Sequence, residues 1–110
     1  MINYTTPTID LIVEGKDITA YDVYATLEQG INEITKHGDD LTVTTETVGQ
    51  TTNTKVSLTL TQAESASFDY TKLVGVQVNW IDSDGKRGAT RKAEITVERN
   101  LLDKVIEYGN

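Results

Sequence analysis

The stretch VGVQVNWIDSDG, residues 74–85, is typical of a β-hairpin. Apolar residues alternate with small or polar residues from Val74 to Trp80, which is the two-residue period of a half-buried strand. Asp82-Ser83-Asp84-Gly85 follows, and Asp-Gly is a hairpin signal because it accepts the positive φ that tight turns need. We therefore expect a strand over 74–81, a turn, and a return strand from Arg87 to Glu98. The residues of the return strand expected to face inward are Ala93, Ile95 and Val97.

The same two-residue period recurs in five segments that precede residue 74. These segments cover residues 9–13, 21–28, 33–36, 41–45 and 56–60. Turn signals separate them roughly every 8–12 residues, the spacing of a small sandwich or barrel. The chain is also rich in threonine, whose branched Cβ suits a half-exposed strand, although the composition of 42–55 suits disorder as well. The sequence predicts an all-β fold: a single immunoglobulin-like β-sandwich of about seven strands over residues 1–110, with a closed barrel as the second architecture.

Two segments depart from this period and predict short helices. Thr61-Gln62-Ala63-Glu64 has the Ser/Thr-x-x-Glu form of a capping box, so a helical turn is expected over 62–67. Phe68 and Tyr70 are expected to hold that turn against the core. Near the end of the chain, Asn100 can cap a helix over 100–107. The apolar stripe of that helix would consist of Leu101, Leu102, Val105 and Ile106.

Composition excludes several classes of function. The chain has 110 residues, no cysteine, one histidine and a net charge of −7. Without cysteine there are no disulfides, no thiol nucleophile and no thiolate metal site. An acidic chain gains little from counterion release, so nucleic acid is not the expected partner. No apolar run approaches the roughly 20 residues that cross a bilayer, and the first residues lack the pattern of a signal peptide, so no membrane contact is expected.

The polar clusters of the sequence do not add up to a catalytic or metal site. If Asp82 opened an EF-hand loop, the sixth and twelfth positions would hold Arg87 and Ala93 in place of glycine and glutamate. His37 has Asp39 and Asp40 nearby, but no nucleophile elbow accompanies it. We therefore expect a protein that is not an enzyme, with no catalytic residue, no cofactor and no bound metal.

Two other features are candidates for contact with a partner. Basic side chains crowd into a single arm of the predicted hairpin: Lys86, Arg87, Arg91, Lys92 and Arg99. They either protect a sheet edge or dock onto an acidic neighbour, which could be a second copy of this chain. The apolar stripe over 100–107 either closes one end of the sandwich or lies in a groove on a partner.

The alternative hypothesis, from a different functional class, is a module that binds a carbohydrate or a receptor. Its contact surface would consist of Tyr21, Tyr24, Trp80 and nearby carboxylates, because aromatic rings suit sugars. Trp80, however, falls on the apolar face of its strand, which favours a place in the core.

The order of motifs along the chain resembles a known group of viral domains. Thr-Thr-Pro-Thr at 5–8 leads into a strand, VSLTLTQAE at 56–64 joins a strand to a turn, and VQVNW at 76–80 precedes the Asp-Gly hairpin. The chain then ends in a Leu-Leu-x-x-Val-Ile tail at 101–106. This order resembles small domains encoded in phages and prophages of Gram-positive bacteria. It is similar to the N-terminal domain of the baseplate upper protein of lactococcal-type phages, an all-β module of virion assemblies.

The resemblance implies a structural or assembly module of a virion, of the baseplate, tail or neck type. Its partners would be other virion proteins or copies of itself, so a homo-oligomer is possible. The module would act in the virion and be made in the bacterial cytoplasm. The expected contact residues are Lys86, Arg87, Arg91, Lys92, Leu101, Leu102, Val105 and Ile106.

Overall fold

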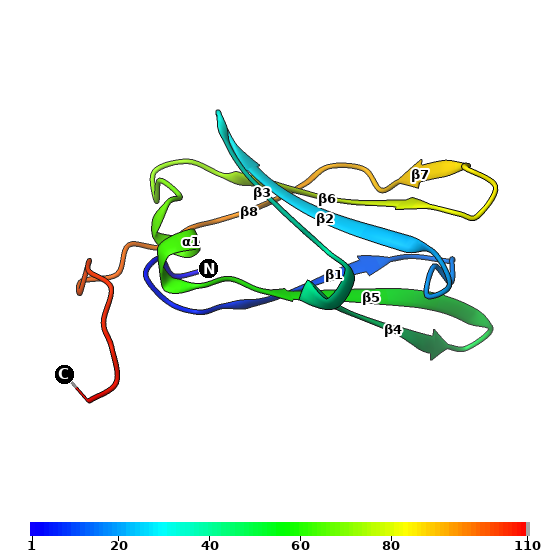
Figure 1. The fold of residues 1–110 in the computed structure, drawn as a ribbon, viewed down its shortest axis with the longest axis horizontal. Helices are drawn as coiled ribbons and strands as arrows, with labels where there is room; N and C mark the ends of the chain where they lie inside the picture. Colours follow the sequence, from blue (N-terminus) through cyan, green and yellow to red (C-terminus); the bar gives the residue numbers. More distant parts are fainter. Residues whose placement is uncertain (110) are drawn as a thin grey trace.

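This computed structural model describes residues 1–109 of the chain. They contain eight β-strands and two short helical segments (Figure 1). In chain order the elements are β1 (Thr8–Val13), β2 (Asp22–Gln29), β3 (Asn32–His37), η1 (Gly38–Asp40), β4 (Leu41–Val48), β5 (Thr51–Thr59), α1 (Gln62–Ala66), β6 (Val74–Ile81), β7 (Arg87–Ala89) and β8 (Ala93–Ile95).

The strands form two sheets with antiparallel pairing. One sheet has three strands in the order β1-β5-β4, and the other has the order β3-β2-β6-β7, with β8 also paired to β6. In Figure 1 the three-stranded sheet lies below the five-stranded sheet, in a sandwich-like arrangement. The all-β prediction is confirmed. The Thr-rich stretch 42–55, whose composition also suits disorder, lies within the β4–β5 hairpin.

The predicted return strand from Arg87 to Glu98 is divided into two, which raises the number of strands above seven. β7 and β8 lie along the same side of β6, and Thr90 lies between them. The backbone N–H of Thr90 donates to the carbonyl of Val78 at 2.9 Å, and the Thr90 hydroxyl accepts from the Val78 N–H at 3.0 Å. A side-chain oxygen thus replaces a backbone carbonyl in the ladder, and the strand is interrupted.

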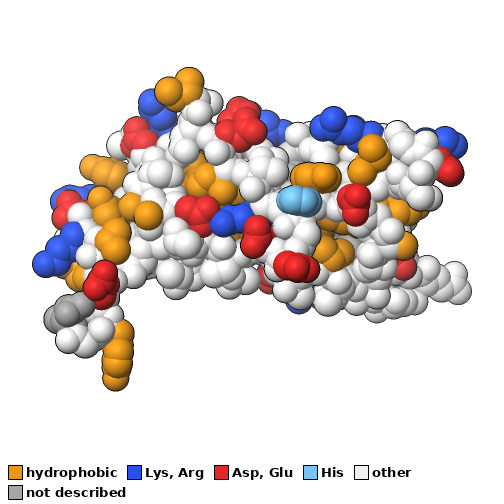
Figure 2. Space-filling view, in the orientation of Figure 1, with side chains coloured by type: hydrophobic (Ala, Val, Ile, Leu, Met, Phe, Trp, Pro, Cys, Tyr) orange, Lys and Arg blue, Asp and Glu red, His pale blue; other side chains and the backbone are white. Residues whose placement is uncertain are grey.

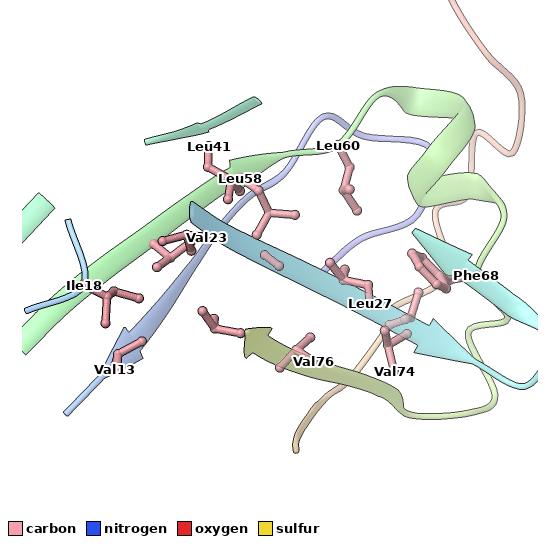
Figure 3. Packing of buried hydrophobic residues seen from close by; sticks show 14 residues of the cluster. Val13, Ile18, Val23, Leu27, Leu41, Leu58, Leu60, Phe68, Val74 and Val76 are labelled. Carbon is pink, nitrogen blue, oxygen red and sulfur yellow. The ribbon is translucent and has the colours of Figure 1, made fainter. Parts of the chain in front are cut away.

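The core lies between the two sheets and is built from the alternating apolar positions. Figure 3 shows side chains of β2 and β6 pointing toward those of β5. The fully or almost fully buried hydrophobic residues are Val13, Ile18, Val23, Ala25, Leu27, Leu41, Val56, Leu58, Leu60, Phe68, Val74, Val76, Val78 and Val97. Each large aliphatic side chain buried in this way contributes roughly 1.5–3 kcal/mol to stability.

The helical turn after β5 forms as its capping box predicts. The Thr61 hydroxyl accepts from the Glu64 N–H at 3.1 Å, and a Glu64 carboxylate oxygen accepts from the Thr61 N–H at 2.9 Å. Phe68 is buried against the core, as expected, and joins α1 to the sheets. Tyr70, which is expected to hold the turn against the core as well, is about half exposed, so the prediction is wrong for this residue.

The predicted helix over residues 100–107 is absent from the described structure. The Asn100 side chain accepts from the Leu102 N–H at 3.0 Å, so the capping contact forms, but no helical turn follows it. Eight residues without a surface to pack on cannot offset the cost of helix nucleation. Residues 99–109, which we call the C-terminal arm, instead leave the two sheets beyond α1 (Figure 1).

Candidate functional site

The C-terminal arm exposes every large apolar side chain predicted to form its stripe. Leu101 is 89% exposed, and Leu102, Val105 and Ile106 are each about half exposed. Tyr108, which follows them in the sequence, is fully exposed. Figure 2 shows hydrophobic side chains on this protruding end of the molecule. The stripe therefore does not close one end of the two sheets.

Polar side chains of the body hold the arm in place, among them Asn3 at its start and Gln62 farther along. The Gln62 amide donates to the carbonyl of Ile106 at 2.8 Å and accepts from the Ile106 N–H at 2.9 Å. The Gln62 side chain therefore pairs with the N–H and the carbonyl of one residue, as the backbone of a neighbouring strand does in a β-sheet. Between the arm and the segment that joins β5 to α1 lies an open hollow, lined by Leu60 and Ala63 on one side and by Val105 and Ile106 on the other. The arm is thus attached by polar contacts while its apolar side chains stay uncovered.

The basic side chains of the predicted return strand do not gather into one patch. Arg87 turns to the outer face of the five-stranded sheet, where its guanidinium donates to the side-chain amide oxygen of Asn79 at 3.0 and 3.3 Å. Arg91 lines a groove between β1 and the β7–β8 edge. The stem of Lys92 crosses Gly75, so closely that a Cβ at Gly75 would overlap it. Lys86 stays exposed at the hairpin turn.

The three aromatic residues of the alternative site do not all share one surface: Tyr24 and Trp80 both line a groove on the five-stranded sheet, and Tyr21 lies elsewhere. Tyr21 lies under the Lys16 ammonium, 5.8 Å from the ring centre, beside the η1 turn. The Trp80 ring packs on Gly88 at the margin of the core, as the apolar-face argument predicted. Tyr24 lies on the outer face of β2, stacked on His37 with ring centres 4.8 Å apart and planes within 5°.

His37 lies against an aromatic ring, at the start of the turn that carries its acidic neighbours. The His37 ring is engaged by Tyr24, and Asp39 and Asp40 lie exposed in η1. Within residues 1–109 no three side chains of His, Asp or Glu come together in a way that could hold a metal ion. The same part of the chain has no helix long and apolar enough to cross a membrane.

A shallow groove on the outer face of the five-stranded sheet gathers polar side chains that the sequence analysis did not group. It has a volume of about 410 Å³, and its polar lining comes from β2, β3, β6 and β7. The groove is lined by Tyr24, Thr26, Glu33, Thr35, Asn79 and Arg87, together with the apolar Trp80 and Ile81. The alternation of β2, β3 and β6 could have placed their outward residues on one face. It could not have shown which strands are neighbours.

The carboxylates with perturbed pKa values lie outside this groove. Burial raises the pKa of Glu64, but hydrogen bonds from Lys36 and from the Thr61 backbone, together with the Lys36 charge, outweigh burial and leave it below its ordinary value. The Lys36 ammonium lies 2.8 Å from the carboxylate. Hydroxyl and backbone hydrogen bonds from Thr19 lower the pKa of Asp17, and those from Thr71 do the same for Asp69. These groups stabilise local structure.

Comparison of the chain with protein-family models, with curated proteins and with solved structures finds no match.

Proposed function

We propose that this chain is a non-enzymatic assembly module of a phage or prophage virion, of the baseplate, tail or neck type. It acts through contacts with copies of itself or with other virion proteins. The motif order described above supports the viral part of the proposal. The exposed C-terminal arm supports the part that concerns assembly.

The arm is the observation that carries the proposal. Five large apolar side chains within eight residues, from Leu101 to Tyr108, are about half exposed or more. A clustered exposed apolar surface of this kind marks a site of protein contact, because covering it removes apolar area from water. The spacing of Leu101, Leu102, Val105 and Ile106 fits one face of a helix. A neighbour's groove can supply the packing that the helix lacks in the isolated chain.

Open sheet edges offer a second means of contact. β4 is an edge of the three-stranded sheet and runs for eight residues, from Leu41 to Val48, without proline. Its one charged residue, Glu46, has the Lys55 ammonium of its own sheet at 3.5 Å. Such an edge presents unpaired backbone groups to which a further strand can add.

The proposal includes an immunoglobulin-like arrangement of strands. The orders β1-β5-β4 and β3-β2-β6-β7 match B-E-D and C′-C-F-G of that fold, with β1 in the place of strand B. In that fold the first strand, A, pairs with B. The correspondence therefore leaves the edge of β1 that faces away from β5 as the place where strand A would lie.

The test removes the part of the arm that follows Asn100 and leaves the sheets complete. A chain that ends after Asn100 keeps the hydrogen bond from the Asn100 N–H to the Asn3 side chain at 2.7 Å. Size-exclusion chromatography with light scattering across a concentration series should show the whole chain associating and the shortened chain remaining a monomer. Thermal melting at low concentration should give similar melting temperatures for both, because the arm buries little in the isolated chain.

Two variants make the result specific. Val105→Ser with Ile106→Ser keeps the length of the arm and should also prevent association. Ile31→Ser changes a fully exposed apolar residue in the β2–β3 turn and should leave association unchanged. A whole chain that stays monomeric at all concentrations and does not bind the other proteins of its virion would contradict the proposal.

A further inference from the structure

We infer that the groove on the outer face of the five-stranded sheet binds an uncharged saccharide of one or two rings. This site is separate from the arm and does not depend on the assembly role. The inference rests on what four side chains offer at the groove: an aromatic ring, a fixed guanidinium, an amide and a carboxylate. They are Tyr24, Arg87, Asn79 and Glu33.

The register of the sheet places these groups around one space. Tyr24 of β2 lies opposite Asn79 of β6, and Ile81 of β6 lies opposite Arg87 of β7. On the other side of β2, Thr26 lies opposite Thr35 of β3, with their hydroxyl oxygens 3.1 Å apart. The groove thus runs across four strands that pair side by side, and its floor is a rigid backbone ladder.

Tyr24 supplies a flat surface for the C–H groups of a sugar ring. One face of its ring is covered by His37, which lies parallel to it at 4.8 Å. The stack holds the Tyr24 ring in one orientation and leaves its second face for the groove. Aromatic faces carry partial negative charge and attract the partly positive C–H groups of a sugar.

Arg87 and Asn79 supply hydrogen-bond donors in a fixed position. Two of the five guanidinium N–H groups point to the Asn79 oxygen, at 3.0 and 3.3 Å. Three N–H groups of Arg87 and the amide N–H groups of Asn79 remain for a ligand. Because Asn79 holds the guanidinium, a ligand that binds it loses less side-chain entropy than it would with a free arginine.

Glu33 supplies the acceptor, and its position is unfavourable for stability. It lies directly opposite Glu28 across the β2–β3 pair, and like charges in that relationship repel. Folding alone therefore gives no reason for a carboxylate here. A carboxylate beside a groove accepts strongly from hydroxyl donors, which a saccharide offers in pairs.

The same groups argue against other kinds of ligand. An apolar molecule would leave the carboxylate, guanidinium and hydroxyls of the groove without partners. A phosphorylated or polyanionic ligand would face Glu33 within a chain whose net charge is −7. The volume of about 410 Å³ is within the range of small-ligand sites and has room for one or two sugar rings.

The experiment is a titration of the full chain, labelled with ¹⁵N, with glucose, galactose, N-acetylglucosamine, rhamnose and lactose, followed by backbone amide shifts. We expect at least one sugar to bind with a dissociation constant in the millimolar range and to shift amides of β2, β3, β6 and β7 around the groove. Arg87→Ala and Glu33→Gln should each weaken binding by about tenfold or more. Loss of binding in Glu33→Gln cannot come from unfolding, because that change removes a repulsion.

The controls are the neighbouring residues of the same kind. Arg91→Ala and Glu28→Gln change an exposed arginine and an exposed glutamate that lie outside the groove and should leave binding unchanged. The inference is overturned if no sugar shifts the amides of the groove, if the shifts fall elsewhere, or if the control variants weaken binding equally. Self-association in light scattering is a separate measurement, so failure here leaves the assembly proposal standing, and the reverse also holds.

Discussion

The hydroxyl of Thr54 accepts a hydrogen bond from the backbone N–H of Ile18 at 3.1 Å, and both residues are completely buried. The same hydroxyl donates to the carbonyl of Lys16 at 2.7 Å. One side chain of β5 therefore satisfies two backbone groups of the loop between β1 and β2. This contact lets a loop without regular structure enter the core, because its buried polar groups have partners.

Replacing Thr54 by valine keeps the shape of the side chain and removes both hydrogen bonds. The Ile18 N–H would then be buried without a partner, which costs about 1–3 kcal/mol of unfolding free energy. Urea denaturation should show this loss as a lower midpoint. Thr54→Ser keeps the hydroxyl and should lose clearly less, so an equal loss in both variants would show that the methyl group, and not the hydrogen bonds, is responsible.

Gly88→Ala tests the contact between β7 and the Trp80 ring. A Cβ at residue 88 would overlap the indole, which must then move from its place over the strand. Forcing extra volume into a packed site costs about 1–3 kcal/mol. We expect a lower melting temperature together with a shift of tryptophan fluorescence to longer wavelength. Ala89→Ser, at the exposed neighbouring position, should change neither measurement.

Glu64→Gln isolates the charge of the Lys36–Glu64 pair, because glutamine can still accept from the Thr61 N–H. The pKa of Glu64 in the folded chain lies below its ordinary value of 4.5, so its contribution is complete above about 4.5. That contribution is lost as the pH falls through the lower, folded pKa. The free-energy difference between wild type and variant should therefore be largest at neutral pH and should shrink in acid. A difference that stays constant across this range would contradict the assignment.

Glu33→Lys should stabilise the chain. The change converts the repulsive Glu28–Glu33 pair across β2 and β3 into an attractive one, and a cross-strand pair of this kind is worth about 0.2–1 kcal/mol at the surface. The gain should diminish when salt is added, because salt screens exposed charges. Unfolding in urea at low and high salt measures both effects. A variant that is less stable than wild type at low salt would show that the two carboxylates do not face each other.

Local patterns predicted several elements correctly. The alternation from Val74 to Trp80 is the strand β6, and the Asp82–Gly85 segment is the turn that follows it. In that turn the Asp82 carboxylate accepts from the N–H groups of Asp84 and Lys86, each at 2.9 Å, and Gly85 has a φ of 82°. The capping box is equally local, since its two partners lie three residues apart. Such contacts join residues that are close together along the chain, so a local sequence pattern is enough to predict them.

Other elements depended on surroundings that no local pattern describes. Ala93 has the inward orientation expected of it, since it pairs with the buried Val76, yet it is exposed because it lies at the open edge of the sheet. The helix predicted at the C-terminal arm needed a surface to pack on, and residues 1–109 provide none. The composition of the Thr-rich stretch also suits disorder, but β4 and β5 pair along it on both sides of the turn at residues 49–50. In each case the presence or absence of contacts with residues distant in the chain determined the outcome.

The sequence by itself determined the all-β class, the position of the turns and the helical turn after β5, because periodicity, turn residues and caps act over a few neighbouring residues. Only the tertiary structure decided the order of the strands, and with it the groove. Tyr24, Glu33 and Arg87 belong to three different strands, and the pairing of β2 with both β3 and β6 places them on one face. Strand pairing is chosen by the packing of the whole core, so residues far apart in the chain become neighbours only after folding.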